Sequence, residues 1–221
     1  MILLAIDTAA NSCAACLYDA ESDQVLASMA DDIGRGHAEH LLGIIDKVLA
    51  AADLTFEEID KFAVTVGPGS FTGIRVGVAT ARSLGLALEK PVVGVSTLEA
   101  IAADHDTDQQ FAVAIQAGRG QAYVQGFDAG AAALDMPYVV KLDDHPSSKI
   151  DPIFVVLIGN AAQLVDDNRA IALLDQATGS IASIAKLGAS SSTPPNPLYV
   201  RAADAKKASG FALPRQAEVA K

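Results

Sequence analysis

Residues 62–88 read FAVTVGPGSFTGIRVGVATARSLGLAL, and the rest of the chain is organised around them. The first five of these residues are mostly apolar and β-branched, and Gly67-Pro68-Gly69 follows them. This order predicts a buried strand that enters a tight turn. Ser70 is a favourable helix N-cap, and the Ala- and Leu-rich residues after it predict a helix.

Small residues recur every four positions along this helix, at Gly73, Gly77, Ala81 and Gly85. They share one face, which is nearly bare of side chains. A helical glycine costs about 0.5–1 kcal/mol relative to alanine, so three of them on one face need a compensating contact. Small residues at this spacing let another helix approach closely. We therefore expect a packing groove that is filled by another helix, and the spacing alone leaves open which chain that helix belongs to.

The residues around this stretch predict an α/β arrangement. Apolar and β-branched runs separated by turn residues predict strands, and apolar residues at helical spacing predict helices. The strands are expected at 2–7, 12–18, 24–29, 62–66 and 91–95, and the helices at 37–52, 70–88 and 96–104. This order describes a mixed sheet covered by helices.

A polar linker at 105–110 marks a change in composition, so we divide the chain into units 1–104 and 105–221. In the second unit, strands are expected at 111–115, 121–127, 138–142 and 153–158, and a helix at 180–187. A Ser- and Pro-rich linker at 190–197 leads to residues 198–201 and an Ala- and Lys-rich tail. We expect the tail either to be partly disordered or to pack back on the first unit.

The charge balance bears on the partners of the chain. The 27 acidic residues outnumber the 16 lysines and arginines, which gives a formal charge of −11. A protein that grips nucleic acid alone usually carries a basic patch, so direct binding of nucleic acid is not expected. No apolar run is long enough to span a bilayer, and the apolar N-terminal run meets Asp7 without a basic leader. We expect a cytoplasmic protein.

Asp7 and Thr8 end the first predicted strand, where a carboxylate could orient a metal-bound phosphate or a water. The turn at 9–12 has no glycine that would let a phosphate approach, so the alternative is an aspartate that caps the turn. The amides at Gly67-Pro68-Gly69-Ser70 could form an anion site, but no Lys-Ser or Lys-Thr follows as in a P-loop. A tight turn that positions the helix is the favoured interpretation.

His37 and His40 lie on one face at the start of a predicted helix, with Glu39 between them. A third metal ligand is missing, and so is the H-E-x-x-H order. We therefore favour hydrogen bonding at the helix start or a partner contact over a metal site. Cys13 and Cys16 have no second pair to complete a zinc site, and we expect them to be small buried hydrophobic residues.

Four segments resemble the bacterial TsaB (YeaZ) family in sequence, order and spacing. They are IDTA at 6–9, HAEHLL at 37–42, GPGSFTGIRVG at 67–77 and PVVGVS at 91–96. The resemblance covers roughly the first hundred residues. Later, PLYVR at 197–201 is the main familiar fragment. Around 116–123 the family often has an acidic residue and paired arginines, whereas this chain has Gln116, Gly118 and Gln121.

The resemblance implies an actin/sugar-kinase/Hsp70-like fold of two subdomains, each a mixed sheet flanked by helices. It also implies membership of the machinery that transfers threonylcarbamoyl to N6 of adenosine 37 in tRNAs that read ANN codons. In that family the paralogue TsaD is the transferring enzyme, and an ATPase, TsaE, joins the complex. This chain would be a non-catalytic scaffold without a cofactor of its own. ATP or ADP and the metal would sit on the partner subunits, and tRNA would be reached only through the complex.

The resemblance further implies that the helices starting at His37 and Ser70 form a bundle with TsaD or with a second copy of the chain. Two alternatives stay open, an independent ATP-dependent phosphotransferase or metallopeptidase of the same fold, and a plain homodimer. Arg75 and Arg82, taken singly, could also be solvated or ion-paired. The expected partner-binding residues are His37, Leu41, Ile45, Ser70, Gly73, Arg75, Gly77, Ala81, Arg82 and Gly85.

Overall fold

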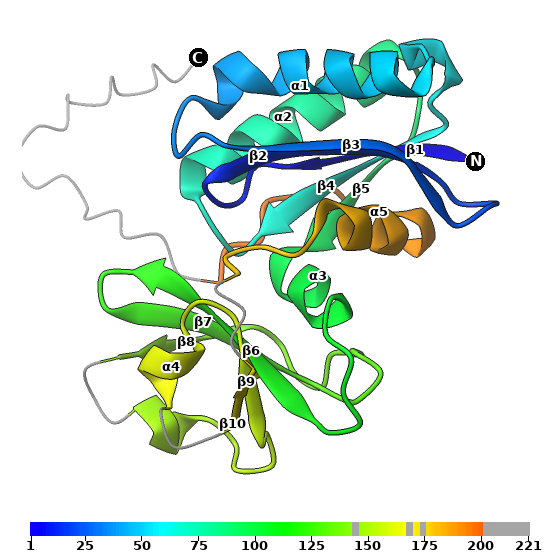
Figure 1. Cartoon of the computed structure of the whole chain (residues 1–221). Coiled ribbons are helices and arrows are strands. Elements are labelled where there is room, and N and C mark those ends of the chain that lie inside the picture. Colours follow the sequence, from blue (N-terminus) through cyan, green and yellow to red (C-terminus); the bar gives the residue numbers. More distant parts are fainter. Residues whose placement is uncertain (143–145, 167–169, 173–175, 201–221) are drawn as a thin grey trace, which may run out of the picture.

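The structure is a computed structural model that describes residues 1–142, 146–166, 170–172 and 176–200. These residues form two five-stranded mixed sheets (Figure 1). In the first sheet, β1 is central, antiparallel to β2 and parallel to β4, with Ile6 opposite Val64. The strand order is β3-β2-β1-β4-β5, with bounds β1 Ile2–Asp7, β2 Ser12–Asp19, β3 Gln24–Asp32, β4 Lys61–Gly67 and β5 Val92–Ser96.

Helices cover both faces of the first sheet. Because side chains alternate along a strand, Leu4 and Ile6 of β1 face α1 (His37–Ala52) and α2 (Phe71–Ala87). Leu3 of β1 faces α5 (Ile181–Ser190) on the other side. Figure 1 shows α1 and α2 together on one face, with α5 on the other face and α3 (Thr97–Ala103) toward the second sheet. A single 3-10 turn, Phe56–Glu58, connects α1 to β4.

The second sheet repeats the topology of the first. Its central strand β6 is antiparallel to β7 and parallel to β9, as β1 is to β2 and β4. The order is β10-β9-β6-β7-β8, with bounds β6 Phe111–Gly118, β7 Gln121–Phe127, β8 Tyr138–Lys141, β9 Val156–Ile158 and β10 Ala170–Ala172. This duplicated arrangement confirms the expected actin/sugar-kinase/Hsp70-like class with two mixed sheets.

The boundaries of the later elements differ from the sequence-based prediction. The strand expected at 153–158 begins only at Val156, because the buried Phe154 ring packs against Gly126 and Asp151 turns the chain before it. Strand β10 and the short helices α4 (Ala162–Val165) and Pro146–Lys149 were not predicted. The division after residue 104 stays a prediction, and the tail at 201–221 lies outside the described residues.

Helix α5 belongs to the second half of the sequence but packs on the first sheet (Figure 1). Both of its ends are held by groups from other elements. At its start, Asp104 accepts hydrogen bonds from the Ser180 hydroxyl at 2.7 Å and from the Ser183 hydroxyl. At its end, Lys61 Nζ donates to the carbonyls of Ala189 and Ser191, each at 2.9 Å. An anion at the N-terminus and a cation at the C-terminus both stabilise a helix dipole.

Among the described helices, none combines the length and the apolar character needed to cross a bilayer.

Candidate functional site

Asp7 ends β1 at the carboxyl edge of the first sheet, where it is buried. Its Oδ1 accepts from the Ala9 amide at 2.9 Å and from the Thr65 hydroxyl, and its Oδ2 accepts from the Thr178 hydroxyl at 2.8 Å. Burial raises the pKa of the Asp7 carboxyl above its ordinary value, and these hydrogen bonds oppose the shift. Because Thr178 precedes α5, the carboxylate ties the two halves of the chain together.

The turn after β1 packs directly on the start of α2. Thr8 Oγ1 donates to the Gly73 carbonyl at 2.7 Å, and the Ser70 amide donates to the Ala9 carbonyl at 2.7 Å. A Cβ atom on Gly69 would lie 2.4 Å from the same Ala9 oxygen. The backbone of the turn therefore lies against the glycines that could otherwise admit a phosphate. This geometry favours the interpretation of Asp7 as a turn-capping residue.

Ser70 is the N-cap of α2, and its hydroxyl accepts from the Gly73 amide at 3.2 Å. Gly67 has a φ of 102°, a left-handed value that favours glycine where β4 leaves the sheet. Since the Ser70 amide and the Gly73 amide both donate within the chain, the segment serves as the tight turn that positions α2.

The stripe of small residues on α2 faces the sheet of its own chain. A Cβ atom on Gly77 would lie 2.4 Å from Thr8 Oγ1, and one on Gly85 would lie 2.2 Å from Val92 Cγ2. Ala81 is fully buried, and Gly73 meets the Thr8 carbonyl. The prediction that a helix of another chain fills this groove is therefore wrong, because Thr8 after β1, Val64 of β4 and Val92 of β5 occupy it.

The predicted residues of α1 also point inward. Leu41 and Ile45 lie in the core beneath α1, and their exposed fractions are 1% and 0%. His37 is buried, and its Nε2 lies 3.0 Å from the Ala10 carbonyl, which agrees with hydrogen bonding at the helix start. These inward positions correct the expectation that Leu41 and Ile45 touch a partner. In the part of the chain that the structure describes, no three His, Cys, Asp or Glu side chains form a group that could hold a metal ion.

Three predicted partner-binding residues, Ser70, Arg75 and Arg82, are exposed. The two arginines belong to an outward stripe of α2 that consists of Phe71, Arg75, Ala79, Arg82 and Leu86. This stripe has steps of three and four residues, which is helical spacing, so helical periodicity could have found it. We call it, together with the exposed Leu42 of the neighbouring α1, the outer face.

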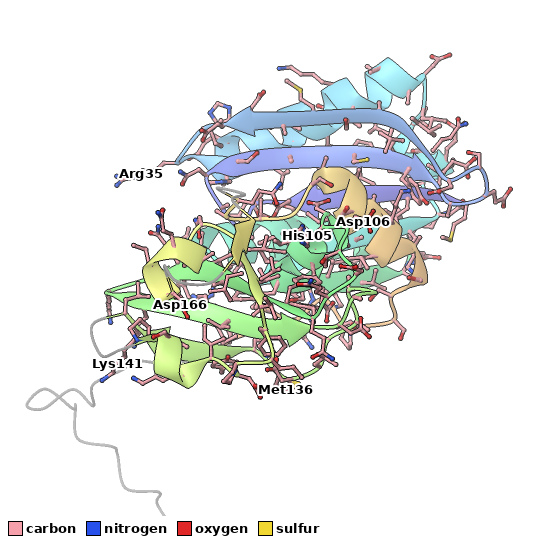
Figure 2. All side chains as sticks on the ribbon, turned by 60° about the horizontal axis from the view of Figure 1, so that its bottom comes forward. Arg35, His105, Asp106, Met136, Lys141 and Asp166 are labelled. Atoms are coloured by element: carbon pink, nitrogen blue, oxygen red, sulfur yellow. The ribbon has the colours of Figure 1, made fainter. Side chains whose placement is uncertain are left out.

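The outer face carries large apolar side chains in water. Leu86 is 83% exposed, Phe71 58% and Leu42 52%. Single exposed apolar residues are ordinary, but several on two adjacent helices indicate an interaction surface. Arg35, which precedes α1, projects outward in Figure 2 and adds a cation near the start of that helix.

Residues 196–199 lie along α2, and the contacts of Asn196 with this helix were not predicted because the sequence placed residues 190–197 in a linker. Arg75 Nε donates to the Tyr199 hydroxyl at 3.1 Å, and its guanidinium carbon lies 3.7 Å from the centre of the Phe71 ring. Arg82 Nη2 donates to Asn196 Oδ1 at 3.3 Å. The Leu198 amide donates to the Val66 carbonyl at 2.7 Å, which anchors the segment to the end of β4.

Cys13 and Cys16 are free and buried within β2. Burial raises the pKa of each thiol to about 11, and for Cys13 the carboxylates of Asp7 and Asp31 add to the effect. Since the thiolate is the reactive form, both cysteines behave at neutral pH as the small hydrophobic residues that the sequence predicted.

Comparisons with known proteins align longer parts of this chain than the short sequence motifs do. The sequence model of the family described as "TsaD: tRNA N6-adenosine threonylcarbamoyltransferase" matches residues 25–144, just over half of the chain. The tRNA threonylcarbamoyladenosine biosynthesis protein TsaB of Buchnera aphidicola subsp. Schizaphis graminum is 36% identical over 125 residues, 55% of this chain and 58% of that protein. TsaB of Escherichia coli K12 is 35% identical over 102 residues, which are 46% of this chain and 43% of that protein. The chain thus spans about half the length of the curated relatives it matches.

A solved structure shares the fold over almost its whole length. It is a Pseudomonas aeruginosa protein described as similar to peptidase YeaZ, with a TM-score of 0.77 and 21% identity. The match covers 90% of this chain and 99% of that chain. At this identity the likeness concerns the fold.

Proposed function

Because this chain belongs to the TsaB (YeaZ) family, within the group matched by the TsaD model, we propose that it is a non-catalytic subunit of a tRNA-modifying complex. The complex would transfer a threonylcarbamoyl group to N6 of adenosine 37 in tRNAs that read ANN codons. The chain would act by binding a catalytic paralogue of the TsaD type, which would carry the metal and the nucleotide. A TsaE-type ATPase would join the same complex.

The outer face is the observation that supports this role. Its exposed Leu42, Phe71 and Leu86 lie on two adjacent helices, and α2 is held rigidly by the contacts of Thr8 with Gly73. A rigid helix pair with apolar residues in water suits docking against helices of a partner. The proposed partner-binding residues are therefore the outward Phe71, Arg75, Arg82 and Leu86 of α2 and Leu42 of α1.

The carboxyl edge of the first sheet supports a non-catalytic role. The Asp7 carboxylate accepts three hydrogen bonds from its own chain, so a ligand would have to displace them. Because the formal charge is −11, tRNA is expected to be held by other subunits. A homodimer would use the same outer face, so self-association and binding of the paralogue would compete.

The test is complex formation with the TsaD-type paralogue of the same organism, followed by light scattering on the mixed proteins. Leu86→Glu places a charge on the most exposed apolar residue of the outer face, and we expect it to weaken the complex at least tenfold. Met136→Glu is the matched control, since Met136 is 77% exposed on the second half of the molecule (Figure 2). Its complex should match the wild type.

Two results would contradict the proposed function. The first is a wild-type chain that forms no complex with the paralogue at micromolar concentrations. The second is a Leu86→Glu chain that melts normally and still binds as the wild type does. Tight binding of magnesium and ATP by the isolated chain, measured by calorimetry, would instead favour an independent enzyme.

A further inference from the structure

Arg75 contacts two aromatic rings in the first half of α2. Its guanidinium carbon lies 3.7 Å from the centre of the Phe71 ring and 5.7 Å from the centre of the Tyr199 ring. The two ring centres are 6.0 Å apart. Both rings remain more than half exposed, so the arginine is held at the surface and not in the core.

The contacts of Arg75 fix its plane and leave its far edge open. The guanidinium lies over the Phe71 ring, and its Nε donates a hydrogen bond to the Tyr199 hydroxyl, so two contacts from different segments restrict it. Within the described part of the chain, its two terminal nitrogens make no hydrogen bond or ion pair. An arginine held in this way loses little conformational freedom when it binds a planar anion.

Tyr199 is held in place by the segment that carries it. The Leu198 amide donates to the Val66 carbonyl at 2.7 Å, and the Thr193 carbonyl accepts from the Gly94 amide at 2.8 Å. Asn196 also accepts a hydrogen bond from Arg82, which lies about two turns after Arg75 on α2. The segment is therefore attached to β4, β5 and α2, and it presents Tyr199 to Arg75 from 124 residues away in the sequence.

We infer that Phe71 and Tyr199 are positioning residues that hold Arg75 as a fork for a carboxylate of the partner protein. The recognition surface would then be a composite of α2 and residues 196–199. This inference rests on the proposed function, since it names the chemistry of the group that docks at the outer face. Two parallel N–H donors match the two oxygens of an Asp or Glu side chain.

Charge and surroundings favour a protein carboxylate over a nucleic-acid phosphate. The chain carries a formal charge of −11, and a phosphate backbone needs several cations in a row. The residues that contact Arg75, Phe71 and Tyr199, are exposed aromatic side chains, and Leu86 further along the same face is exposed and apolar; a protein surface covers such groups and a phosphate backbone does not. A fork with an apolar surround is the usual form of an arginine anchor in a protein interface.

The experiment measures the affinity of the full chain for the TsaD-type paralogue at low and high salt. Arg75→Lys keeps the charge and removes the fork, and it should weaken binding roughly tenfold. Arg75→Ala should weaken it roughly 10- to 100-fold and flatten the salt dependence, because one ion pair is lost. Tyr199→Phe keeps the ring and removes the acceptor for Nε, and it should weaken binding about threefold to fivefold without a change in net charge.

Lys141→Ala is the charge-matched control, since Lys141 lies on β8 in the second half of the molecule (Figure 2). It should bind as the wild type does. Melting temperatures of all variants separate a folding defect from a binding defect. We expect all variants to melt as the wild type does and the Arg75 and Tyr199 variants to lose affinity to different degrees. Only the Arg75→Ala protein should show a changed salt dependence of binding.

If the wild-type chain binds the paralogue and every Arg75 and Tyr199 variant binds it equally well, this inference is overturned and the proposed function still stands. A loss confined to self-association, or to RNA binding by the isolated chain, would overturn it as well. A wild-type chain that does not bind the paralogue would overturn the proposed function and this inference with it.

Discussion

A methyl group added at Gly73 tests how closely α2 packs on its own sheet. The Cβ atom of Gly73→Ala would lie 2.0 Å from the Thr8 carbonyl oxygen and 3.2 Å from Ser70 Oγ. The first of these is backbone at the end of a buried strand, so the helix or the turn must move. Any movement would also disturb the hydrogen bond from Thr8 Oγ1 to the Gly73 carbonyl.

The size of the effect follows from three opposing contributions. Forcing atoms into a packed site costs about 1–3 kcal/mol, and a weakened hydrogen bond costs about 0.5–1.5 kcal/mol. Alanine in a helix recovers about 0.5–1 kcal/mol relative to glycine. The free energy of unfolding should therefore fall by roughly 1–3 kcal/mol. At about 2–4 °C for each kcal/mol, the melting temperature should fall by roughly 2–12 °C for a chain of this size.

The assay is thermal and urea unfolding of the isolated chain followed by circular dichroism. Gly43→Ala is the matched control, because Gly43 lies in the middle of α1 and a Cβ atom there would meet nothing within 4 Å. It should raise the free energy of unfolding by about 0.5–1 kcal/mol. A Gly73→Ala protein that is as stable as the Gly43→Ala protein would refute the packing of α2 against β1, and it would restore the stripe as a groove for a partner.

Three further predictions concern the start of α5, the buried Asp7 carboxyl and the two buried cysteines. Asp104→Ala removes the acceptor for the Ser180 and Ser183 hydroxyls at the start of α5, so the free energy of unfolding in urea should fall by roughly 1–2 kcal/mol; an unchanged midpoint would contradict this role. Burial raises the pKa of Asp7 in the folded state above the ordinary aspartate pKa of 3.8. The contribution of Asp7 to the free energy of unfolding is therefore fully present at a pH below 3.8, and it is lost as the pH rises through the folded-state pKa. The stability of the wild type relative to Asp7→Asn should therefore decline as pH rises above about 4, and a rising difference in urea titrations would show the sign to be wrong. Cys13 and Cys16 should resist a thiol reagent in the native protein at pH 7.5 and react once it is unfolded; rapid modification of the folded chain would contradict their burial.

The local elements of the first half could be predicted from the sequence because their signals lie within a few residues. The apolar run before Gly67 predicted β4, and Ser70 predicted the start of α2, where its hydroxyl does accept from the Gly73 amide. The stripe from Gly73 to Gly85 was likewise recognised as a close-packing face. Turn, cap and periodicity signals involve neighbours no more than about four positions apart, so the order of residues alone contains them.

The tertiary structure decided what each face meets. Periodicity places Gly73 and Gly77 on one face but does not say whether that face meets the chain's own sheet or another protein, and here Thr8 lies against both. The contacts of Asp7 with Thr178 and of Arg75 with Tyr199 join residues 171 and 124 positions apart. Such pairs depend on how two sheets and the returning segment fold together. For this chain, the sequence by itself determined the strands of the first half, the Ser70 cap and the small-residue stripe of α2. The three-dimensional packing decided that this stripe meets the chain's own sheet and that Phe71, Arg75 and Leu86 are exposed.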